Sequence, residues 1–435
     1  MAMPPSPPEE AAEDKKILAI PFAKSIGRMA LVVGTFDTKS VELSFMRDRL
    51  MALGIATKTV DLSTSSKPSS ADVSPQQIAA MHPDGASAVF LDDRGQSVVA
   101  MADAFARWIS QERGIGGIIS AGGSGGTSLA TAGMRQLPVG IPKIMVSTIA
   151  SGDVGNYVGP SDIMMMYSVA DIQGLNPIVE QVLGNAAHAL AGMIANLPSA
   201  EMREAKRMNA RPAIGMTMFG VTTPCIQAIQ KRLEEDFDCL VFHATGTGGR
   251  SMEKLADSGL IQSFIDLTTT EVADMIVGGV MPSNRDRFGA AIRMKLPFVG
   301  SVGALDMVNF GPSKSVPEKF KSRKFVVHNS QVTLMRTTSD ENREIGKWVG
   351  ERLNLMEGQV RFLLPEGGVS MLDAPGKAFY DPEADNALFE AIKKTVHETA
   401  KRRVERVKAN INDAAFVEAA IAAFRSITSR HQRRI

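Results

Sequence analysis

Cysteine and net charge are both scarce in this chain. Its 435 residues include two cysteines, Cys225 and Cys239, and carry a formal net charge of +1. One bridge at most does not make a disulfide framework, so we expect a reducing compartment and a cytoplasmic protein. Almost no net charge means no overall field that attracts nucleic acid or an acidic membrane, so neither is expected as a partner. Aromatic residues, at 6%, are too few to suggest a surface that stacks bases.

Long apolar runs and paired metal-ligand spacings are missing too. The most apolar early stretch, residues 17–33, is interrupted by Lys24 and Arg28, so it does not resemble a membrane span. The Pro-rich, acidic start does not resemble a secretory signal, and we expect residues 1–27 to be a partly disordered tail. The six histidines show no paired ligand spacing and CxxC does not occur, so a zinc site is not expected.

What the sequence does have is a repeated alternation of apolar runs and amphipathic segments. Runs such as residues 28–36 are continuous rather than alternating, as in buried parallel strands, and a helical pattern follows. Another strand, ending in acidic residues, is expected within residues 86–95. The pattern stops at the polar stretch 198–211 and then starts again. This predicts an α/β fold of two Rossmann-like, doubly wound subdomains, residues 28–204 and 205–435, each with a mostly parallel sheet flanked by helices.

A glycine-rich loop follows the strand expected at residues 115–120. A helical pattern begins near Thr127, directly after the loop. Backbone amides without Cβ atoms can approach a ligand closely, and a helix start adds a positive dipole end, so the loop is predicted to bind an oxyanion such as phosphate. The alternative, a tight strand-to-helix turn, needs only one or two glycines. No lysine follows the last glycine as in a Walker A loop, and Ser128 stands at the third small position of a dinucleotide fingerprint. The residues assigned to the phosphate are Gly122, Gly123, Ser124, Gly125, Gly126 and Thr127.

The loop after the first strand, Gly34 to Lys39, carries groups that can complete such a site. Thr35, Thr38 and Lys39 can hold phosphate oxygens, and Asp37 can hold magnesium directly or through water. Lys39 can also be a solvated residue that opens a helix, although a cation there opposes the helix dipole.

Asp92 and Arg94 are predicted to follow another strand at the same edge of the sheet. Arg94 can clamp a phosphate through two hydrogen bonds, or it can pair locally with Asp92 or Asp93. Because adjacent residues on a strand point to opposite faces, the two aspartates do not suggest a glycosidase pair.

The second half has its own glycine loop, Ala244–Arg250, after the strand that carries His243. Hydroxyl side chains are dense at the expected strand ends, which suits a polar, oxygen-rich small molecule, although helix capping accounts for about half of them. The residues predicted to bind this second ligand are Thr222, Thr223, Thr245, Gly246, Thr247, Gly248, Gly249, Arg250, Thr269 and Thr270.

Candidates for chemistry are few, and no catalytic residue is assigned. Cys225 lies in a first helical turn, where a thiolate would be stabilised, but a small buried residue is the preferred interpretation because no histidine is near. His243 can act as an acid or base at neutral pH or be a structural group. Glu271, at a helix start, is a third candidate.

Motifs including LVVGTFDTK, GGSGGTSLAT, VFHATGTGGR and DLTTTEVAD occur in order between about Arg28 and about Phe424. Together they resemble the family of bacterial, fungal and plant proteins related to the tomato mosaic virus resistance protein. The resemblance implies two Rossmann-like subdomains, a homodimer, and ATP bound with Mg²⁺ in the first subdomain. It implies no reaction.

These observations predict an ATP- and Mg²⁺-binding protein with a second small-molecule site in a cleft between the subdomains. One hypothesis is ATP-dependent activation of a small carboxylate or sugar-acid-like metabolite. The alternative is a non-catalytic, nucleotide-gated module that binds a partner protein, which the lack of a convincing general base favours. A third class, a sugar-phosphate or nicotinamide enzyme, is disfavoured for nicotinamide by the missing third glycine.

Overall fold

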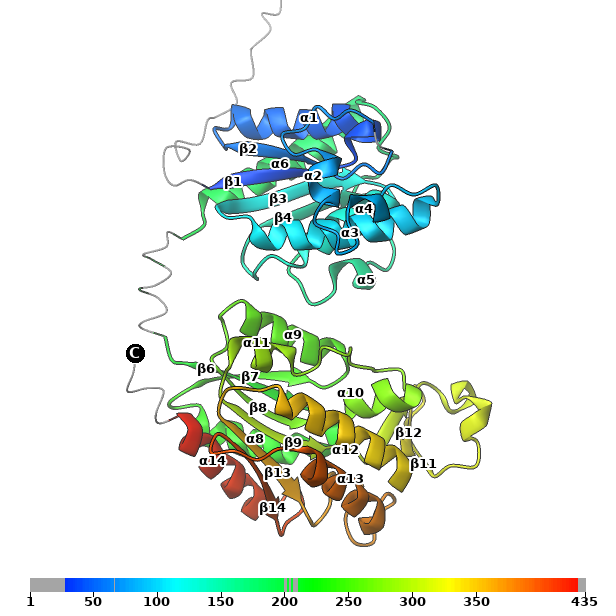
Figure 1. The fold of residues 1–435 in the computed structure, drawn as a ribbon, viewed down its shortest axis with the longest axis vertical. Helices are drawn as coiled ribbons and strands as arrows, with labels where there is room; N and C mark the ends of the chain where they lie inside the picture. Colours follow the sequence, from blue (N-terminus) through cyan, green and yellow to red (C-terminus); the bar gives the residue numbers. More distant parts are fainter. Residues whose placement is uncertain (1–27, 66, 199–201, 203–204, 206–209, 429–435) are drawn as a thin grey trace, which may run out of the picture. The chain divides into compact units, whose positions relative to one another are not determined.

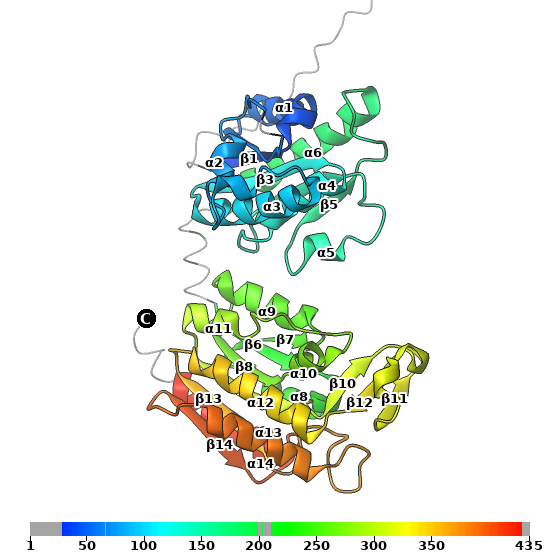
Figure 2. The same cartoon turned by 45° about the vertical axis from the view of Figure 1, so that its right-hand side comes forward.

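The computed structural model describes residues 28–65, 67–198, 202, 205 and 210–428, so the predicted tail at residues 1–27 lies outside the described residues. The chain divides into two compact units, Met1–Pro198 and Ser199–Ile435. Each unit is built around its own parallel sheet with helices on both faces (Figures 1 and 2). The predicted α/β class, with two parallel sheets flanked by helices, is confirmed.

The first unit alternates strands and helices along the chain. Within the described residues its sheet has the order β2-β1-β3-β4-β5, with every pair parallel. Helices α1 and α6 pack on one face of this sheet, and α3 and α4 pack on the other. The elements are β1 (Met29–Gly34), α1 (Phe36–Ala52), β2 (Thr57–Asp61), α2 (Pro75–Ala79), η2 (Ala86–Ala88), α3 (Arg94–Gln111), β3 (Ile115–Gly122), α4 (Ser124–Met134), β4 (Lys143–Ser147), α5 (Gly155–Val158), β5 (Met164–Tyr167) and α6 (Pro177–Ala195).

The prediction of a strand within residues 86–95 is wrong. A short 3₁₀ turn, η2, lies there instead, and a loop leads from it into α3. Val89 is buried in the core cluster under α3 and pairs with no described strand. The short apolar run around it is therefore buried outside the sheet. Asp93 caps α3, accepting the Gln96 N–H at 2.9 Å. Such runs are too short for periodicity to separate a strand from a buried turn.

The second unit repeats the pattern with a larger sheet. The order of its parallel sheet is β14-β13-β9-β8-β6-β7, and a separate antiparallel sheet has the order β10-β12-β11. The run FVVHN forms β11 of the antiparallel sheet. The elements are β6 (Ala213–Met218), η3 (Gly220–Thr222), α8 (Thr223–Leu233), β7 (Asp238–His243), α9 (Thr247–Asp257), β8 (Ser263–Thr268), α10 (Thr270–Ala273), η4 (Asp274–Gly278), α11 (Gly289–Met294), β9 (Phe298–Gly303), β10 (Met307–Phe310), η5 (Ser313–Ser315), η6 (Glu318–Phe320), β11 (Phe325–Asn329), β12 (Val332–Arg336), α12 (Ser339–Asn354), β13 (Val360–Pro365), α13 (Pro382–Thr395), β14 (Arg402–Val407) and α14 (Ala414–Thr428).

Both parallel sheets have an order that creates a topological switch point. In the first unit, β1 leads through α1 to β2 on one side, while the neighbouring β3 leads through α4 to β4 on the other. In the second unit, β6 and β8 diverge in the same way. Ligands of open parallel sheets bind beyond the carboxyl ends of two such strands. The chain therefore contains two candidate positions, one after β1 and β3 and one after β6 and β8.

Candidate functional site

The switch point of the first unit brings two of the predicted loops together. Val33 of β1 pairs with Ser120 of β3, so Gly34 and Gly122 end neighbouring strands at nearly the same level. The loop from Gly34 to Lys39 and the first glycine loop therefore leave the same edge of the sheet. The sequence predicted each loop, and the strand order places them side by side.

The first glycine loop is mostly the first turn of a helix. α4 begins at Ser124, earlier than the predicted start near Thr127, and Gly123 is its N-cap. Thr127 is the first residue whose N–H bonds back, to the Gly123 carbonyl at 2.9 Å. The preceding amides of Ser124, Gly125 and Gly126 have no acceptor inside a helix and point beyond its end.

Internal packing and backbone conformation do not require glycine at this helix start. Gly123, Gly125 and Gly126 are absent from the residues with positive φ. A Cβ atom added at Gly125 would meet no atom within 4 Å, and one at Gly123 would lie 3.7 Å from Thr148 Oγ1. Glycines that the chain does not need for itself are typical of a backbone that a ligand approaches.

The start of α1 is organised differently, because its first amides are already occupied. The Phe36 N–H donates to Asp61 Oδ1 at 3.0 Å, and the Asp37 N–H donates to Ser63 Oγ at 3.1 Å. Asp61 is only 2% exposed. A buried carboxylate therefore faces this helix start, whereas the first amides of α4 have no acceptor within their helix. No motif pointed to Asp61 or Ser63, and their only sequence signal is their place at the end of β2 and just beyond it.

The oxygen-bearing side chains of this loop suit a hard cation. The Thr35 and Thr38 hydroxyls lie 2.9 Å apart, and Asp37 Oδ1 accepts the Ser63 hydroxyl at 2.9 Å. Mg²⁺ binds through one or two carboxylates, with phosphate oxygens and waters completing its shell. Among the described residues no group of three His, Cys, Asp or Glu side chains could hold a metal. The donors present fit Mg²⁺ only if a ligand supplies the remaining oxygens.

Asp92 and Arg94 do not lie as the sequence suggested, and Lys39 already has a partner within the protein. The Lys39 ammonium donates to the carbonyl of Ile172, in the segment between β5 and α6. Asp92 and Arg94 are exposed at the start of α3 and do not follow a strand. Since α3 leads into the first residue of β3, its start still lies toward the carboxyl ends of the strands.

In the second unit three of the six threonines predicted to bind a ligand, Thr222, Thr269 and Thr270, are buried and bonded within the protein. The hydroxyls of Thr222 and Thr268 lie 2.8 Å apart, and the Thr269 hydroxyl donates to the Ser301 carbonyl at 3.3 Å. Thr270 likewise donates to a backbone carbonyl. These side chains hold the strand ends together. The more accessible members of the predicted set are Thr223, Thr245, Thr247, Gly248 and Arg250.

In the second glycine loop, unlike the first, packing against neighbouring atoms requires glycine. A Cβ atom at Gly248 would lie 1.9 Å from the His243 carbonyl oxygen, and one at Gly249 would lie 2.0 Å from a carboxylate oxygen of Glu271. Gly246 has φ +77°, where other residues are strained. These glycines make a close turn, so their presence is no evidence for a ligand.

Glu271 belongs to a buried ion cluster around Arg287. Its two carboxylate oxygens accept Arg287 Nε at 2.5 Å and the Gly246 N–H at 2.6 Å. Arg287 also pairs with Asp266 at 2.6 Å and Glu253 at 3.0 Å. Burial lowers the pKa of Arg287, but the three facing carboxylates raise it well above its ordinary value. No motif pointed to Arg287, because its partners lie 16 to 34 residues away.

The other two catalytic candidates lie in contrasting surroundings. Cys225 is fully buried in an apolar core, and burial raises the pKa of its thiol to about 12. The thiolate is therefore not the form present at neutral pH. His243 is exposed at the end of β7, with its ring edge-on to Phe219 at 5.2 Å.

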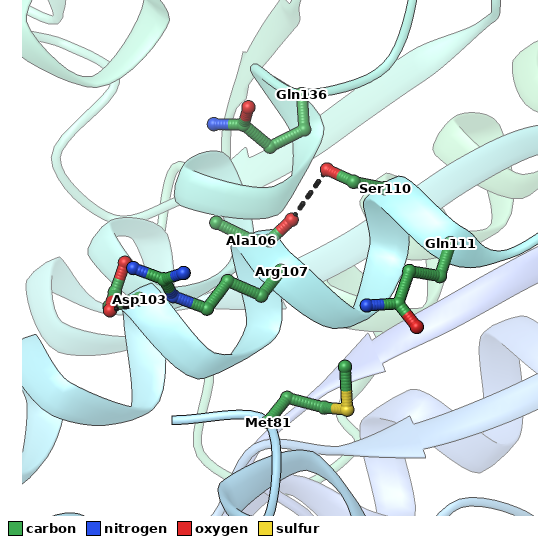
Figure 3. A pocket seen from close by; sticks show the side chains of 7 residues that line it. All are labelled: Met81, Asp103, Ala106, Arg107, Ser110, Gln111 and Gln136. Carbon is green, nitrogen blue, oxygen red and sulfur yellow. Dashed lines mark hydrogen bonds and ion pairs between the residues drawn. The ribbon is translucent and has the colours of Figure 1, made fainter. Parts of the chain in front are cut away.

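Two surface hollows lie away from both switch points. One of about 500 Å³ surrounds the second half of α3, at the end that leads into β3 (Figure 3). There Arg107 pairs with Asp103 at 3.1 Å, and the Ser110 hydroxyl donates to the Ala106 carbonyl. A second, of about 760 Å³, lies along α12 and α13. Neither includes a residue that the sequence assigned to a ligand.

The fold and these edges define an α/β protein of two doubly wound units, the first with an accessible glycine-rich helix start. The chain belongs to the UPF0261 family. The models described as the N-terminal and C-terminal domains of "Uncharacterised protein family (UPF0261)" match residues 28–198 and 211–428. Helices in the described part of the chain are all too short or too polar to cross a membrane.

Relatives in bacteria and plants support this assignment. A UPF0261 protein of Rhizobium meliloti is 54% identical over 92% of this chain and 98% of its own length. The ToMV resistance protein Tm-1 of Solanum lycopersicum is 43% identical over 94% of this chain, which spans 57% of that protein. The resemblance inferred from the motifs is confirmed. A UDP-N-acetylglucosamine 2-epimerase structure from Rickettsia bellii aligns with a TM-score of 0.21 and 12% identity over 62% of this chain and 78% of that one, too weak a likeness to bear on function.

Proposed function

We propose that the first unit binds ATP together with Mg²⁺ beyond the carboxyl ends of β1 and β3. The observation that carries this proposal is the start of α4, where glycines stand although neither φ nor packing demands them. The second glycine loop provides the internal comparison, because there every bare position is explained by a close neighbour or by φ. Accessible amides at a helix start at a switch point favour an anionic ligand.

In this proposal the start of α4 binds the phosphate and the start of α1 binds the cation. The amides of Ser124, Gly125 and Gly126 would hold phosphate oxygens. Asp37, with the nearby threonine hydroxyls, would hold Mg²⁺, which neutralises phosphate charge when bound. The carboxylate of Asp61, buried against the first turn of α1, disfavours an anion there and favours a cation.

We infer a binding role rather than turnover, in which the nucleotide sets a state of the protein that a partner reads. The contacts in the second unit favour this alternative over activation of a small carboxylate or sugar acid. Glu271 is paired to Arg287, Cys225 is a buried thiol, and the threonines after β8 are bonded within the fold. A second small molecule in this unit would have to use accessible groups such as His243, Thr247 and Arg250.

A thermal-shift titration of the full chain tests the nucleotide site. With ATP and Mg²⁺ at 100 times Kd, the free energy of unfolding is expected to rise by about 2.7 kcal/mol. The Gly125→Val variant fills the open space in front of the amides, so it should lose this stabilisation while folding normally.

The matched control is Gly192→Val in α6, where a Cβ also meets no atom within 4 Å. This variant should keep the full response to ATP and Mg²⁺. A wild-type protein that gains no stability from ATP, or a Gly125→Val protein that responds like the wild type, contradicts the proposal.

A further inference from the structure

The segment Ser168–Asn176, here called the strap, joins β5 to α6. Hydrogen bonds connect it to α1 and, through Ser147, to α4, the two helices that begin at the first switch point. At one end, the Ser168 N–H donates to the Ser147 carbonyl at 3.2 Å, where β4 ends. The Ser147 hydroxyl lies 2.6 Å from the Thr127 hydroxyl in the first turn of α4. The strap is therefore attached, through one residue, to the helix start proposed to bind phosphate.

At its other end the strap is anchored to α1 by two side chains. The Gly174 N–H donates to Glu42 Oε1 at 2.7 Å, and the Lys39 ammonium donates to the Ile172 carbonyl. Lys39 departs from helical geometry, with φ −131° and ψ 22°, within the first turn of α1. Lys39 therefore links the loop after β1 to the strap.

The strap also contains a strained turn. Val169 has φ +65°, which is a genuine outlier for a β-branched residue, and its side chain is 63% exposed. The Ala170 N–H donates to the Ser168 carbonyl at 2.7 Å across Val169, which makes a γ-turn of the rare, strained kind. Such strain persists only where surrounding contacts hold it, and it is typical of switch segments.

We propose that the strap responds to ligand binding because Lys39 exchanges its hydrogen-bond acceptor, from the Ile172 carbonyl to the ligand. This inference rests on the proposed nucleotide site. Without ligand, the lysine ammonium is bonded to the Ile172 carbonyl. A phosphate held at α4 lies across the same strand edge and offers a charged acceptor, which makes a stronger hydrogen bond than a neutral carbonyl. The ammonium moves to the phosphate, the strap loses one of its two α1 anchors, and the turn at Val169 can relax.

Hydrogen–deuterium exchange of the full-length protein, measured at the amides of Ser168 to Gly174, tests whether Lys39 leaves the Ile172 carbonyl when ligand binds. Saturating ATP and Mg²⁺ should speed exchange of these amides about tenfold, since a hydrogen bond to a charged group is lost. Lys39→Met should show the fast exchange already without ligand and gain nothing further from ATP. Val169→Gly, which relieves the positive φ, should slow exchange in the ligand-free protein.

Lys58→Met is the matched control, because the Lys58 ammonium is bonded to Glu112 and lies over the ring of Trp108. It should behave like the wild type. If ATP raises the melting temperature but strap exchange stays constant, or if Lys39→Met leaves ligand-free exchange unchanged, the strap proposal is wrong while the nucleotide site stands. If ATP stabilises no form of the protein, the nucleotide site fails and this proposal fails with it.

Discussion

Arg287 is the residue on which the candidate site of the second unit depends most. It lies fully buried and balances three carboxylates, from Asp266, Glu271 and Glu253. Glu271 in turn holds the Gly246 N–H, so the cluster also shapes the turn after β7. Asp266 lies in β8, and Glu271 lies in α10 directly after it. Both carboxylates are paired with Arg287, so the acids at this strand end do not form an open binding surface.

We expect Arg287→Met to lower the free energy of unfolding by about 3–5 kcal/mol, because it leaves buried carboxylates without their counter-charge. Urea denaturation followed by circular dichroism measures this. Arg293→Met is the control: its pairs with Asp257 and Asp286 are half-exposed, so the change should stay within about 1 kcal/mol. Equal effects of the two substitutions would show that the buried cluster has no special role.

At the scale of elements, the two glycine loops look alike in sequence and differ in structure. The first becomes the opening turn of α4, and the second packs against its neighbours' backbone and carboxylates. The sequence places both loops after strands, because a continuous apolar run followed by glycine is a local pattern. It could not tell them apart, since the atoms that confront Gly248 and Gly249 come from His243 and Glu271 through the fold.

Alanine substitutions should separate the two loops. Gly248→Ala puts a Cβ atom within 2 Å of a backbone oxygen, so we expect a loss of about 1–3 kcal/mol in stability. Gly125→Ala has open space and gains helix propensity, so stability should rise by up to about 1 kcal/mol while ATP binding weakens. Denaturant titration and calorimetric binding would measure both, and a stable Gly248→Ala protein would contradict this distinction.

At the scale of the whole molecule, the two units differ in how their carboxyl groups are buried. Burial is the main cause that raises the pKa of Asp274 and Asp306 to about 7 and that of Asp385 to about 9, and all three lie in the second unit. Asp306 and Asp385 lie near the buried guanidinium of Arg336, which opposes the shift. In the folded unit these groups keep protons that an unfolded chain, with a carboxyl pKa near 4, has released.

The second unit therefore takes up protons when it folds, between about pH 4 and pH 7 at Asp274 and Asp306 and up to about pH 9 at Asp385. Its free energy of unfolding should fall as pH rises through that range. Calorimetry at pH 5 and pH 8 should show the lower stability at pH 8. Asp306→Asn should flatten the decline, whereas Asp340→Asn, at an exposed helix start, should leave it unchanged. A decline that is identical in all three proteins would rule out Asp306 as a source.

The amino-acid sequence by itself determined the α/β class, the two-part organisation of strands and helices, the family, and the loops that follow the strands, because all of these are written in local periodicity and in short motifs. Only the tertiary structure decided which loop has free amides, which carboxylates are paired, and where Lys39 and Arg94 lie. Those properties depend on atoms brought together from distant positions, such as Asp61 against Phe36 or Ile172 against Lys39. Strand order and burial, rather than residue type, separate a binding surface from a packed core.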